Sequence, residues 1–554
     1  MCSMVAFVGV NDIMHRVQPE PQYTRLYCRM NSMNPSALRT ALSGGDEIAL
    51  LDPREQGEFG VCHLFWAVNA PLSRFELEVP RLVPRLSAPI VLTTAGDVGL
   101  GGLATTALAA LGYTDVTVYP DTPEDWAAAG FTLYSGINVP SKAFGEAVEH
   151  HYGTPSVDAT ELKAMKDRGD DLVVLDARTF AEYRNMNIPG GISVPGGELA
   201  YRVRDLAPSP DTTVVVNCAG RTRSILGAQS VINAGIPNKV VALENGTMGW
   251  HLAGLELEHG RADRFVAGDP KTIDAALAMR DRIAAAYDVT IIDRDRLATW
   301  QAEADERTLY LLDVRDPEEF VAGHLPGSRS APGGQLVQAT DFQIGVPNGR
   351  IVLIDDTRVR ATMTAHWLVQ MGYRDVSVLS EGVSGDLETG AGPGQTLPDV
   401  PTIDVETLAA QPGDSTVLDV GESREFRKSH IPSARWAIRS RIAETGLALP
   451  DTGTVVITSA DGKLAALAVA EVQALTGANV CALEGGTNAW IALGYPTEAD
   501  PLVPADEECI DVYLRAYDRN ADVEARMQEY IDWEIALIDQ IAADDDVSFI
   551  LGTS

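Results

Sequence analysis

Residues 214–224 read VVVNCAGRTRS, an apolar strand that ends in Cys218 and passes through a short loop into a helical pattern. A thiol at such a junction faces free backbone N–H groups and the positive end of a helix macrodipole. Arg221 and Arg223 add two full positive charges to the same loop. These surroundings favour a reactive thiolate and an anionic substrate. Although most free cysteines are buried and inert, this one is our candidate nucleophile.

The strand before the loop belongs to a pattern that recurs at a spacing of roughly 110–140 residues. Each of four units has an apolar strand that ends in aspartate, at residues 49–52, 173–176, 310–313 and 416–419. A Glu-aromatic pair follows in each, at 58–59, 182–183, 319–320 and 425–426, and then a second apolar strand at 90–93, 214–217, 351–354 and 454–458. Strands that alternate with helices predict an α/β fold, with a mostly parallel sheet flanked by helices on both faces of each unit.

Two copies also close on a Gly- and Trp-bearing turn, NGTMGW at 245–250 and GGTNAW at 485–490. In this order the motifs resemble the rhodanese superfamily, over nearly all of residues 34–500 as four tandem copies. The resemblance implies rhodanese-like domains at 34–142, 155–262, 290–390 and 402–500, of which 155–262 is active. We expect residues 1–33 to form a disordered tail and residues 501–554 to form a helical C-terminal extension.

The second copy alone has a cysteine at the loop position. The third copy has Asp355 there, and a carboxylate cannot carry a sulfane sulfur. Its Arg358 and Arg360 match the two loop arginines, and the sequence leaves open whether they bind a regulatory anion or only balance Asp355 and Asp356. In the other copies the aligned residue depends on the anchor chosen: Thr94 or Ala95 in the first, Ser459 or Ala460 in the fourth.

These three copies are therefore expected to be inactive modules that build interfaces, shape a cleft or bind a partner. Two-domain members of the family pack an inactive first domain against an active second, which implies that copies 1 and 2 form one pair and copies 3 and 4 another. We expect the repeated polar residues and tryptophans to tie loops together or pack in the core: Asp176, Arg178, His324, His430, Trp250 and Trp490.

Residues 505–542 show an acidic helical pattern, which predicts a dimerisation or domain-bridging helix, so a homodimer is one expected assembly. The net charge of −35 disfavours binding to nucleic acid and to anionic membrane surfaces. No apolar run approaches the roughly 18 residues needed to cross a bilayer. Six widely spaced cysteines indicate neither a disulfide framework nor a zinc site, and we expect a cytoplasmic protein with no metal or organic cofactor.

The loop from Cys218 to Arg223 has six residues, a length that in the family resembles sulfurtransferases; one more residue accompanies phosphatases and arsenate reductases. The expected cycle moves sulfur from thiosulfate, or from a persulfide, through a Cys218 persulfide to cyanide or a thiol. The arginines would orient the donor, and the amides of Ala219, Gly220, Arg221, Thr222, Arg223 and Ser224 would hold the persulfide. The alternative is a sulfur-relay or scaffold protein that takes sulfur from a partner protein.

Overall fold

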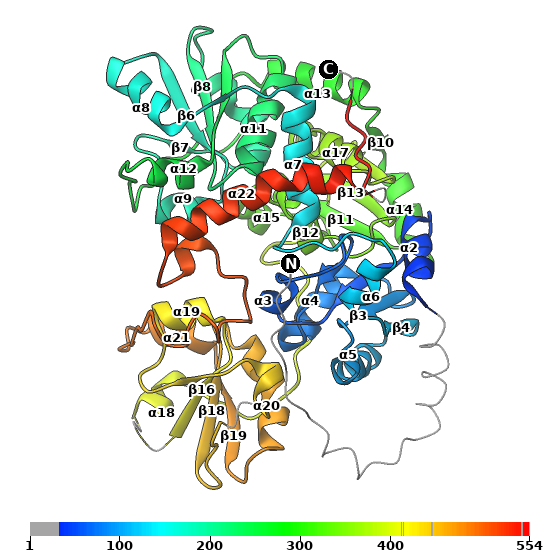
Figure 1. Cartoon of the computed structure of the whole chain (residues 1–554), viewed down its shortest axis with the longest axis vertical. Helices are drawn as coiled ribbons and strands as arrows, with labels where there is room; N and C mark the ends of the chain where they lie inside the picture. The colour runs from blue at the N-terminus through cyan, green and yellow to red at the C-terminus, as the bar shows by residue number, and fades with distance from the viewer. Residues whose placement is uncertain (1–32, 411–412, 414, 445–446, 545–546, 553–554) are drawn as a thin grey trace.

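The computed structural model describes residues 33–552 except 411–412, 414, 445–446 and 545–546. Within these residues the chain forms four parallel sheets, each in an α/β unit of its own (Figure 1). The expected tail, residues 1–33, lies outside the described part apart from Met33, which packs against the core of the first unit. No helix in the described part combines the length and the apolarity that a bilayer crossing requires.

The first unit has a four-stranded sheet in the order β2-β1-β3-β4. Its strands are β1 (Ala49–Asp52), β2 (Val68–Asn69), β3 (Ile90–Thr93) and β4 (Val116–Tyr119). Its helices are α2 (Pro35–Ser43), α3 (Gln56–Phe59), the 3₁₀ turn η1 (Leu72–Arg74), α4 (Phe75–Leu82), α5 (Val98–Ala110) and α6 (Pro123–Ala128). The helix α7 (Val139–Tyr152) then leads into the second unit.

The second unit has a five-stranded sheet in the order β5-β9-β8-β6-β7. Its strands are β5 (Ser156–Val157), β6 (Leu172–Asp176), β7 (Ile192–Ser193), β8 (Thr213–Asn217) and β9 (Val240–Leu243). Its helices are α8 (Ala159–Arg168), α9 (Phe180–Asn185), the 3₁₀ turn η2 (Gly196–Glu198), α10 (Leu199–Leu206), α11 (Thr222–Asn233) and α12 (Gly246–Leu252).

The third unit follows the linking helix α13 (Ile273–Ala286) and repeats the five-stranded order as β10-β14-β13-β11-β12. Its strands are β10 (Thr290–Ile292), β11 (Leu309–Asp313), β12 (Arg329–Ser330), β13 (Arg350–Ile354) and β14 (Val376–Leu379). Its helices are α14 (Arg294–Ala302), α15 (Pro317–Ala322), α16 (Gly333–Gln338), the 3₁₀ turn η3 (Thr340–Phe342) and α17 (Val359–Gln370).

The fourth unit repeats the order as β15-β19-β18-β16-β17. Its strands are β15 (Thr402–Ile403), β16 (Ser415–Asp419), β17 (Arg435–Trp436), β18 (Thr454–Thr458) and β19 (Asn479–Leu483). Its helices are α18 (Val405–Ala410), α19 (Ser423–Lys428), the 3₁₀ turn η4 (Arg439–Arg441), α20 (Lys463–Gln473) and α21 (Gly486–Ala492).

Side chains of one strand enter two cores, one on each face of the sheet. Val214 and Val216 of β8 pack in one apolar cluster of the second unit, and Val215 packs in another on the opposite face. All three are fully buried. The continuous apolar strands read from the sequence thus reflect parallel sheets that helices cover on both faces, as predicted.

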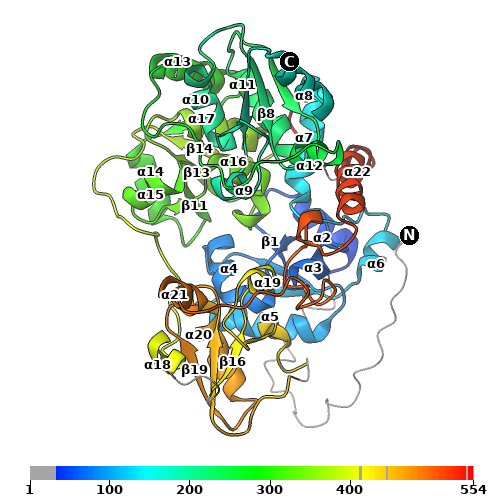
Figure 2. The ribbon, with the colours of Figure 1, turned by 90° about the vertical axis from the view of Figure 1, so that its left-hand side faces the viewer.

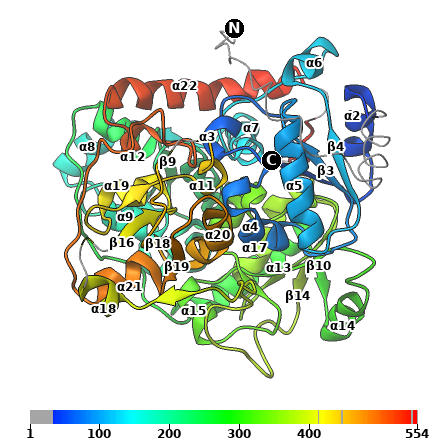
Figure 3. The ribbon, with the colours of Figure 1, turned by 90° about the horizontal axis from the view of Figure 1, so that it is seen from below.

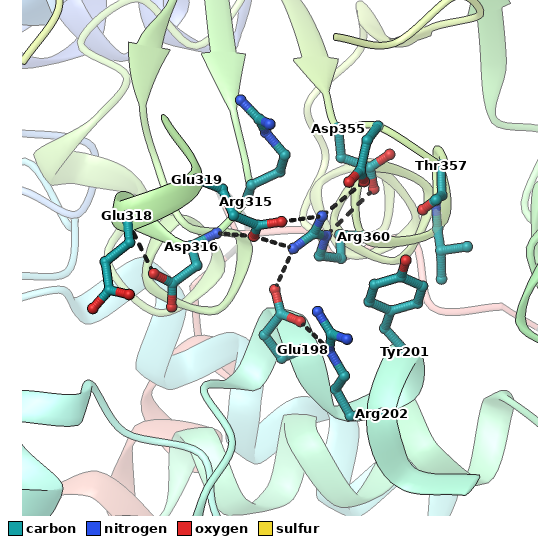
Figure 4. A network of polar contacts seen from close by, with 12 residues as sticks. Glu198, Tyr201, Arg202, Arg315, Asp316, Glu318, Glu319, Asp355, Thr357 and Arg360 are labelled. Atoms are coloured by element: carbon teal, nitrogen blue, oxygen red, sulfur yellow. Dashed lines mark hydrogen bonds and ion pairs between the residues drawn. The ribbon is translucent and has the colours of Figure 1, made fainter. Parts of the chain in front are cut away.

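The second unit pairs with the third across matching elements, in the upper half of Figure 1. A Cβ atom on Gly334 of α16 would lie 2.8 Å from the Cα atom of Gly196 in η2, so the two backbones are in direct contact. Trp367 Nε1 of α17 donates to Ser230 Oγ of α11 at 2.8 Å. At the centre, Arg360 joins Glu198 of the second unit to the third (Figure 4).

The first unit pairs with the fourth, and the two lie together in the lower half of Figure 2. Arg439 of η4 makes hydrogen bonds of 2.7 and 2.8 Å to Glu76 of α4, and Ser440 donates to Glu55 at 2.8 Å. The first unit also shares one continuous apolar core with the third. The expected pairs 1–2 and 3–4 do not describe these contacts: the second unit packs against the third, and the first packs against both the third and the fourth.

The C-terminal extension is helical only in its last part. Residues 505–522 do not form the expected helix, apart from the 3₁₀ turn η5 (Ala516–Asp518), because their backbone bonds to other units. Ile510 O accepts from Gly57 N at 2.7 Å, and Tyr513 N donates to Gln56 Oε1 at 2.9 Å. The helix α22 (Val523–Ala542) then lies along α7 and α12, which makes it the predicted domain-bridging helix (Figures 1 and 3).

Candidate active site

Cys218 occupies the first position after β8, at the carboxyl end of the parallel sheet where such folds bind ligands. Its side chain is buried, with 2% of the residue surface exposed. The Sγ atom donates to the hydroxyl oxygen of Ser224 at 3.5 Å. Thr247 N and Met248 N, at the start of α12, donate to the carbonyl oxygens of Cys218 and Ala219 at 2.8 and 3.0 Å. The loop is thus held in place by the neighbouring β9–α12 turn.

The repeated Asp and Arg at the strand ends tie loops together, as predicted. Arg178 donates to both carboxylate oxygens of Asp176, at 2.9 and 2.7 Å, and to Met186 O at 2.6 Å. The third unit repeats this clamp with Arg315 and Asp313. His324 and His430 stack on the phenylalanine four residues earlier, with ring centroids 3.9 Å apart. Of these residues, Asp176 and Arg178 lie at the edge of the sheet from which the Cys218 loop emerges.

Arg223 is the positive charge beside the thiol. Its guanidinium group makes two hydrogen bonds of 2.8 Å to Glu182 of α9. Burial disfavours its charge, but Glu182 first, and then the negative charge that Cys218 can carry, raise the pKa of Arg223 above its usual value. Burial likewise opposes ionisation of Glu182, yet Arg223, and then Arg515 and Arg178, hold the pKa of Glu182 well below the usual range. The pair stays ionised at neutral pH.

Arg221 anchors the loop to α7. Its guanidinium group donates to both oxygens of Glu146 at 2.8 Å, and also to Glu149. The sequence suggested one role, donor binding, for both loop arginines. The structure separates them, because α7 presents two buried or half-buried carboxylates to Arg221.

A further carboxylate reaches the loop from α22. Glu534 is completely buried and accepts from Thr222 N at 3.2 Å and from the Thr222 hydroxyl. Lys142 Nζ lies 3.6 Å from Glu534. Burial, together with Glu534 and Glu149, raises the pKa of Glu146 to about 7 against the opposing effect of Arg221.

Two of the six backbone amides expected to hold the persulfide already have partners. Thr222 N donates to Glu534, and Ser224 N donates to Arg221 O at 3.1 Å.

Backbone hydrogen bonds and strand ends resolve the alignment of the other loops. Thr487 N donates to Ser459 O at 2.9 Å, as Thr247 N does to Cys218 O, so Ser459 rather than Ala460 matches the cysteine. In the first unit β3 ends at Thr93, so Thr94 takes this place. In the third, buried Asp355 accepts from Ala361 N at 2.9 Å. Each of these loops holds an oxygen-bearing side chain where the second unit holds sulfur.

The family model for the rhodanese-like domain matches residues 158–253, 295–388 and 404–493. This chain belongs to the rhodanese family. The first unit lies outside these matches but has the same sheet without the first edge strand. Cys218, Cys481 and Cys509 are free thiols.

Three known proteins show how far the similarity extends. A crystal structure described as thiosulfate sulfurtransferase from Pseudomonas aeruginosa is 47% identical in sequence and superposes with a TM-score of 0.85. The match covers 94% of the present chain and 99% of the Pseudomonas chain. The HTH-type transcriptional regulator Rv0324 of Mycobacterium tuberculosis is 30% identical over 110 residues, which are 20% of this chain and 47% of the regulator. SseB of the same organism, named as a provisional thiosulfate sulfurtransferase, is 27% identical over 227 residues, covering 33% of this chain and 72% of SseB.

The residues around the loop that sequence reasoning missed are Glu146, Glu149, Arg515, Tyr530 and Glu534. They come from α7 and the C-terminal extension, and Glu534 is 312 positions away from Thr222. No local periodicity carries that information. The helical pattern at 505–542 predicted a helix that bridges domains, but it did not indicate which elements the helix would contact.

Proposed function

We propose that this protein is a sulfurtransferase that carries sulfane sulfur as a persulfide on Cys218. The observation that carries the proposal is the placement of this thiol between the end of β8 and the start of α11, beside Arg223. A cationic group and a helix N-terminus both favour the thiolate, which is the nucleophile. The 47% identity with the thiosulfate sulfurtransferase of Pseudomonas aeruginosa supports thiosulfate as donor.

In the first half-reaction the Cys218 thiolate attacks the outer sulfur of thiosulfate. A new S–S bond forms, the bond to the SO₃ group breaks, and its electron pair leaves with sulfite. Arg223, whose charge is felt by the Cys218 thiol, would offset the negative charge of the donor and of the leaving group. The ion pair with Glu182 fixes the orientation of this guanidinium group.

In the second half-reaction cyanide or a thiolate attacks the terminal sulfur, and the Cys218 thiolate is restored. Between the two steps the loop amides of Ala219, Gly220, Arg221 and Arg223 would hold the persulfide, since those of Thr222 and Ser224 have other partners. Splitting the transfer into two displacements is the usual benefit of covalent catalysis.

The test is thiocyanate production from thiosulfate and cyanide by the parent protein, Cys218→Ser and the control Cys62→Ser. We expect Cys218→Ser to lose at least about 10³-fold in rate, as for removal of a nucleophile, and Cys62→Ser to keep the parent rate. Intact-mass spectra after thiosulfate treatment should show a gain of one sulfur atom that requires Cys218. A parent protein with neither turnover nor mass gain would refute the proposal. Persulfide formation only from a protein persulfide would instead favour the sulfur relay.

A further inference from the structure

The C-terminal extension returns to the loop that carries Cys218. Arg515 lies 3.7 Å from Glu182, the carboxylate that also binds Arg223. The ring of Tyr530 lies against the same loop, since a Cβ atom on Gly220 would lie 3.0 Å from Tyr530 Cε1. Glu182 is thus shared by two arginines, one from the loop and one from the extension.

A cavity of about 240 Å³ opens beside this contact. Its lining includes three arginines, Arg515, Arg519 and Arg526, and a single carboxylate, Glu529. Tyr530 forms part of the wall, and the same ring contacts Gly220, so it lies between the cavity and the Cys218 loop. We call this space the arginine antechamber. Arg515 also borders a second cavity, of about 280 Å³, where Arg74, Arg81 and Arg424 are balanced by Glu78 and Glu422.

The charges of the antechamber are only partly balanced. Arg526 lies 2.8 Å from Glu529. Among the described residues, no carboxylate lies within 4.0 Å of the Arg519 guanidinium group. The Arg515 side chain is 41% exposed and holds Glu182 only at 3.7 Å, so it can contact a ligand as well. In a chain with a net charge of −35, a positive cavity one side chain away from the Cys218 loop is a local exception.

We propose that the arginine antechamber admits the anionic sulfur donor and that Arg515 binds it next to Cys218. This inference rests on the proposed function and adds a binding residue and a substrate class, small oxyanions such as thiosulfate. The Cys218 thiol is itself nearly inaccessible, so the donor has to approach through space next to the loop. Positive charges along that space raise the local concentration of an anion and repel cations.

Alkylation of Cys218 tests this without requiring sulfur transfer. The thiolate displaces iodide from iodoacetate, an anion, or from iodoacetamide, which is neutral and nearly the same size. Peptide mass spectrometry gives the rate at Cys218 for both reagents. We expect Arg515→Gln to lower the iodoacetate-to-iodoacetamide rate ratio about fivefold, the effect of one charge at roughly 4 Å under water-like screening. Arg515→Lys should restore most of the ratio, and Arg519→Gln should lower it less.

The control Arg261→Gln removes the same charge from an exposed side chain of the second unit and should leave the ratio unchanged. In turnover, Arg515→Gln should lower kcat/KM for thiosulfate about tenfold and kcat/KM for cyanide by less than about twofold. Equal changes in both alkylation rates, or none, would overturn the inference. If the ratio falls as expected while the parent protein shows no thiosulfate turnover, the antechamber stands and the proposed function fails.

Discussion

Replacing Arg360 by methionine should destabilise the interface between the second and third units. The guanidinium group is fully buried and binds Glu198 at 2.7 Å and Glu319 at 2.6 Å (Figure 4). It also binds Asp356 at 2.7 Å. Asp355, also fully buried, lies 3.9 Å away. Methionine keeps the unbranched aliphatic stem but has no charge, so the variant leaves these carboxylates facing one another without their shared cation.

The expected magnitude follows from this geometry. Removing one partner of a buried ion pair typically costs about 3–5 kcal/mol, because the remaining charge is left uncompensated. For a cooperative unit of about 150–250 residues, each kcal/mol lowers Tm by about 2–4 °C. We therefore expect the calorimetric transition that contains the two central units to fall by about 6–20 °C at pH 8.

The loss should be smaller in acid. Burial, together with Asp356, raises the pKa of Asp355 to about 6, and Arg360 is the main influence that lowers it. Without Arg360 this pKa rises further, so Asp355 is neutral at pH 5 and no longer requires a cation. A carboxyl whose pKa is raised by folding destabilises the protein increasingly as the pH rises through that value. The deficit of Arg360→Met should therefore grow from pH 5 to pH 8.

Scanning calorimetry of the parent, Arg360→Met and the exposed control Arg296→Met at both pH values measures this. The control lies on the same unit and should shift Tm by less than about 2 °C, as surface substitutions usually do. The reasoning would be refuted by a shift of Arg360→Met no larger than that of the control. A large shift that is identical at pH 5 and pH 8 would refute the part assigned to Asp355.

Two further predictions concern other carboxylates. Folding raises the pKa of Glu146 to about 7, so its protonated form stabilises the protein at low pH and this contribution, about 3 kcal/mol, is lost as the pH rises from about 4.5 to 7. Glu146→Gln should therefore gain stability relative to the parent between pH 5 and pH 8 in urea unfolding; a constant difference would contradict this. Arg439→Met removes the buried cation that holds Glu76 and Glu471. It should cost about 1.5–3 kcal/mol and speed amide hydrogen exchange in α4 and α20; unchanged exchange in both helices would argue against the 1–4 pair.

The strand ends show how much of the fold could be predicted from local sequence. The strands predicted at 90–93 and 454–458 match β3 and β18, and the aspartates at 52, 176, 313 and 419 each end a strand. The run of apolar residues is enough to predict these strands, because a strand buried on both faces must be apolar along its length. The one-residue ambiguity at Thr94 and Ser459 remained, because aligning a loop requires the backbone hydrogen bonds of its neighbour.

Which units pack against each other could not be predicted from the sequence. The repeats suggested the pairs 1–2 and 3–4, but the contacts also join the second unit to the third and the first to the fourth: Arg360 lies 162 positions from Glu198, and Arg439 lies 363 from Glu76. Repetition shows that units share a fold. It does not show which surfaces are complementary, since that depends on a few side chains whose partners lie in another repeat.

The sequence by itself determined the repeated α/β unit, the presence of a thiol in one loop and the charge of Arg223 near it. These are local properties, set by a strand, a loop and a helix within eleven residues, 214–224. Only the tertiary structure decided that Arg221 binds Glu146 of α7, that Glu534 accepts hydrogen bonds from Thr222 and that Arg515 lies near the Cys218 loop. The physical reason is that charge and burial at a site depend on every segment packed against it. Here one of those segments is the C-terminal extension, about 300 residues further along the chain.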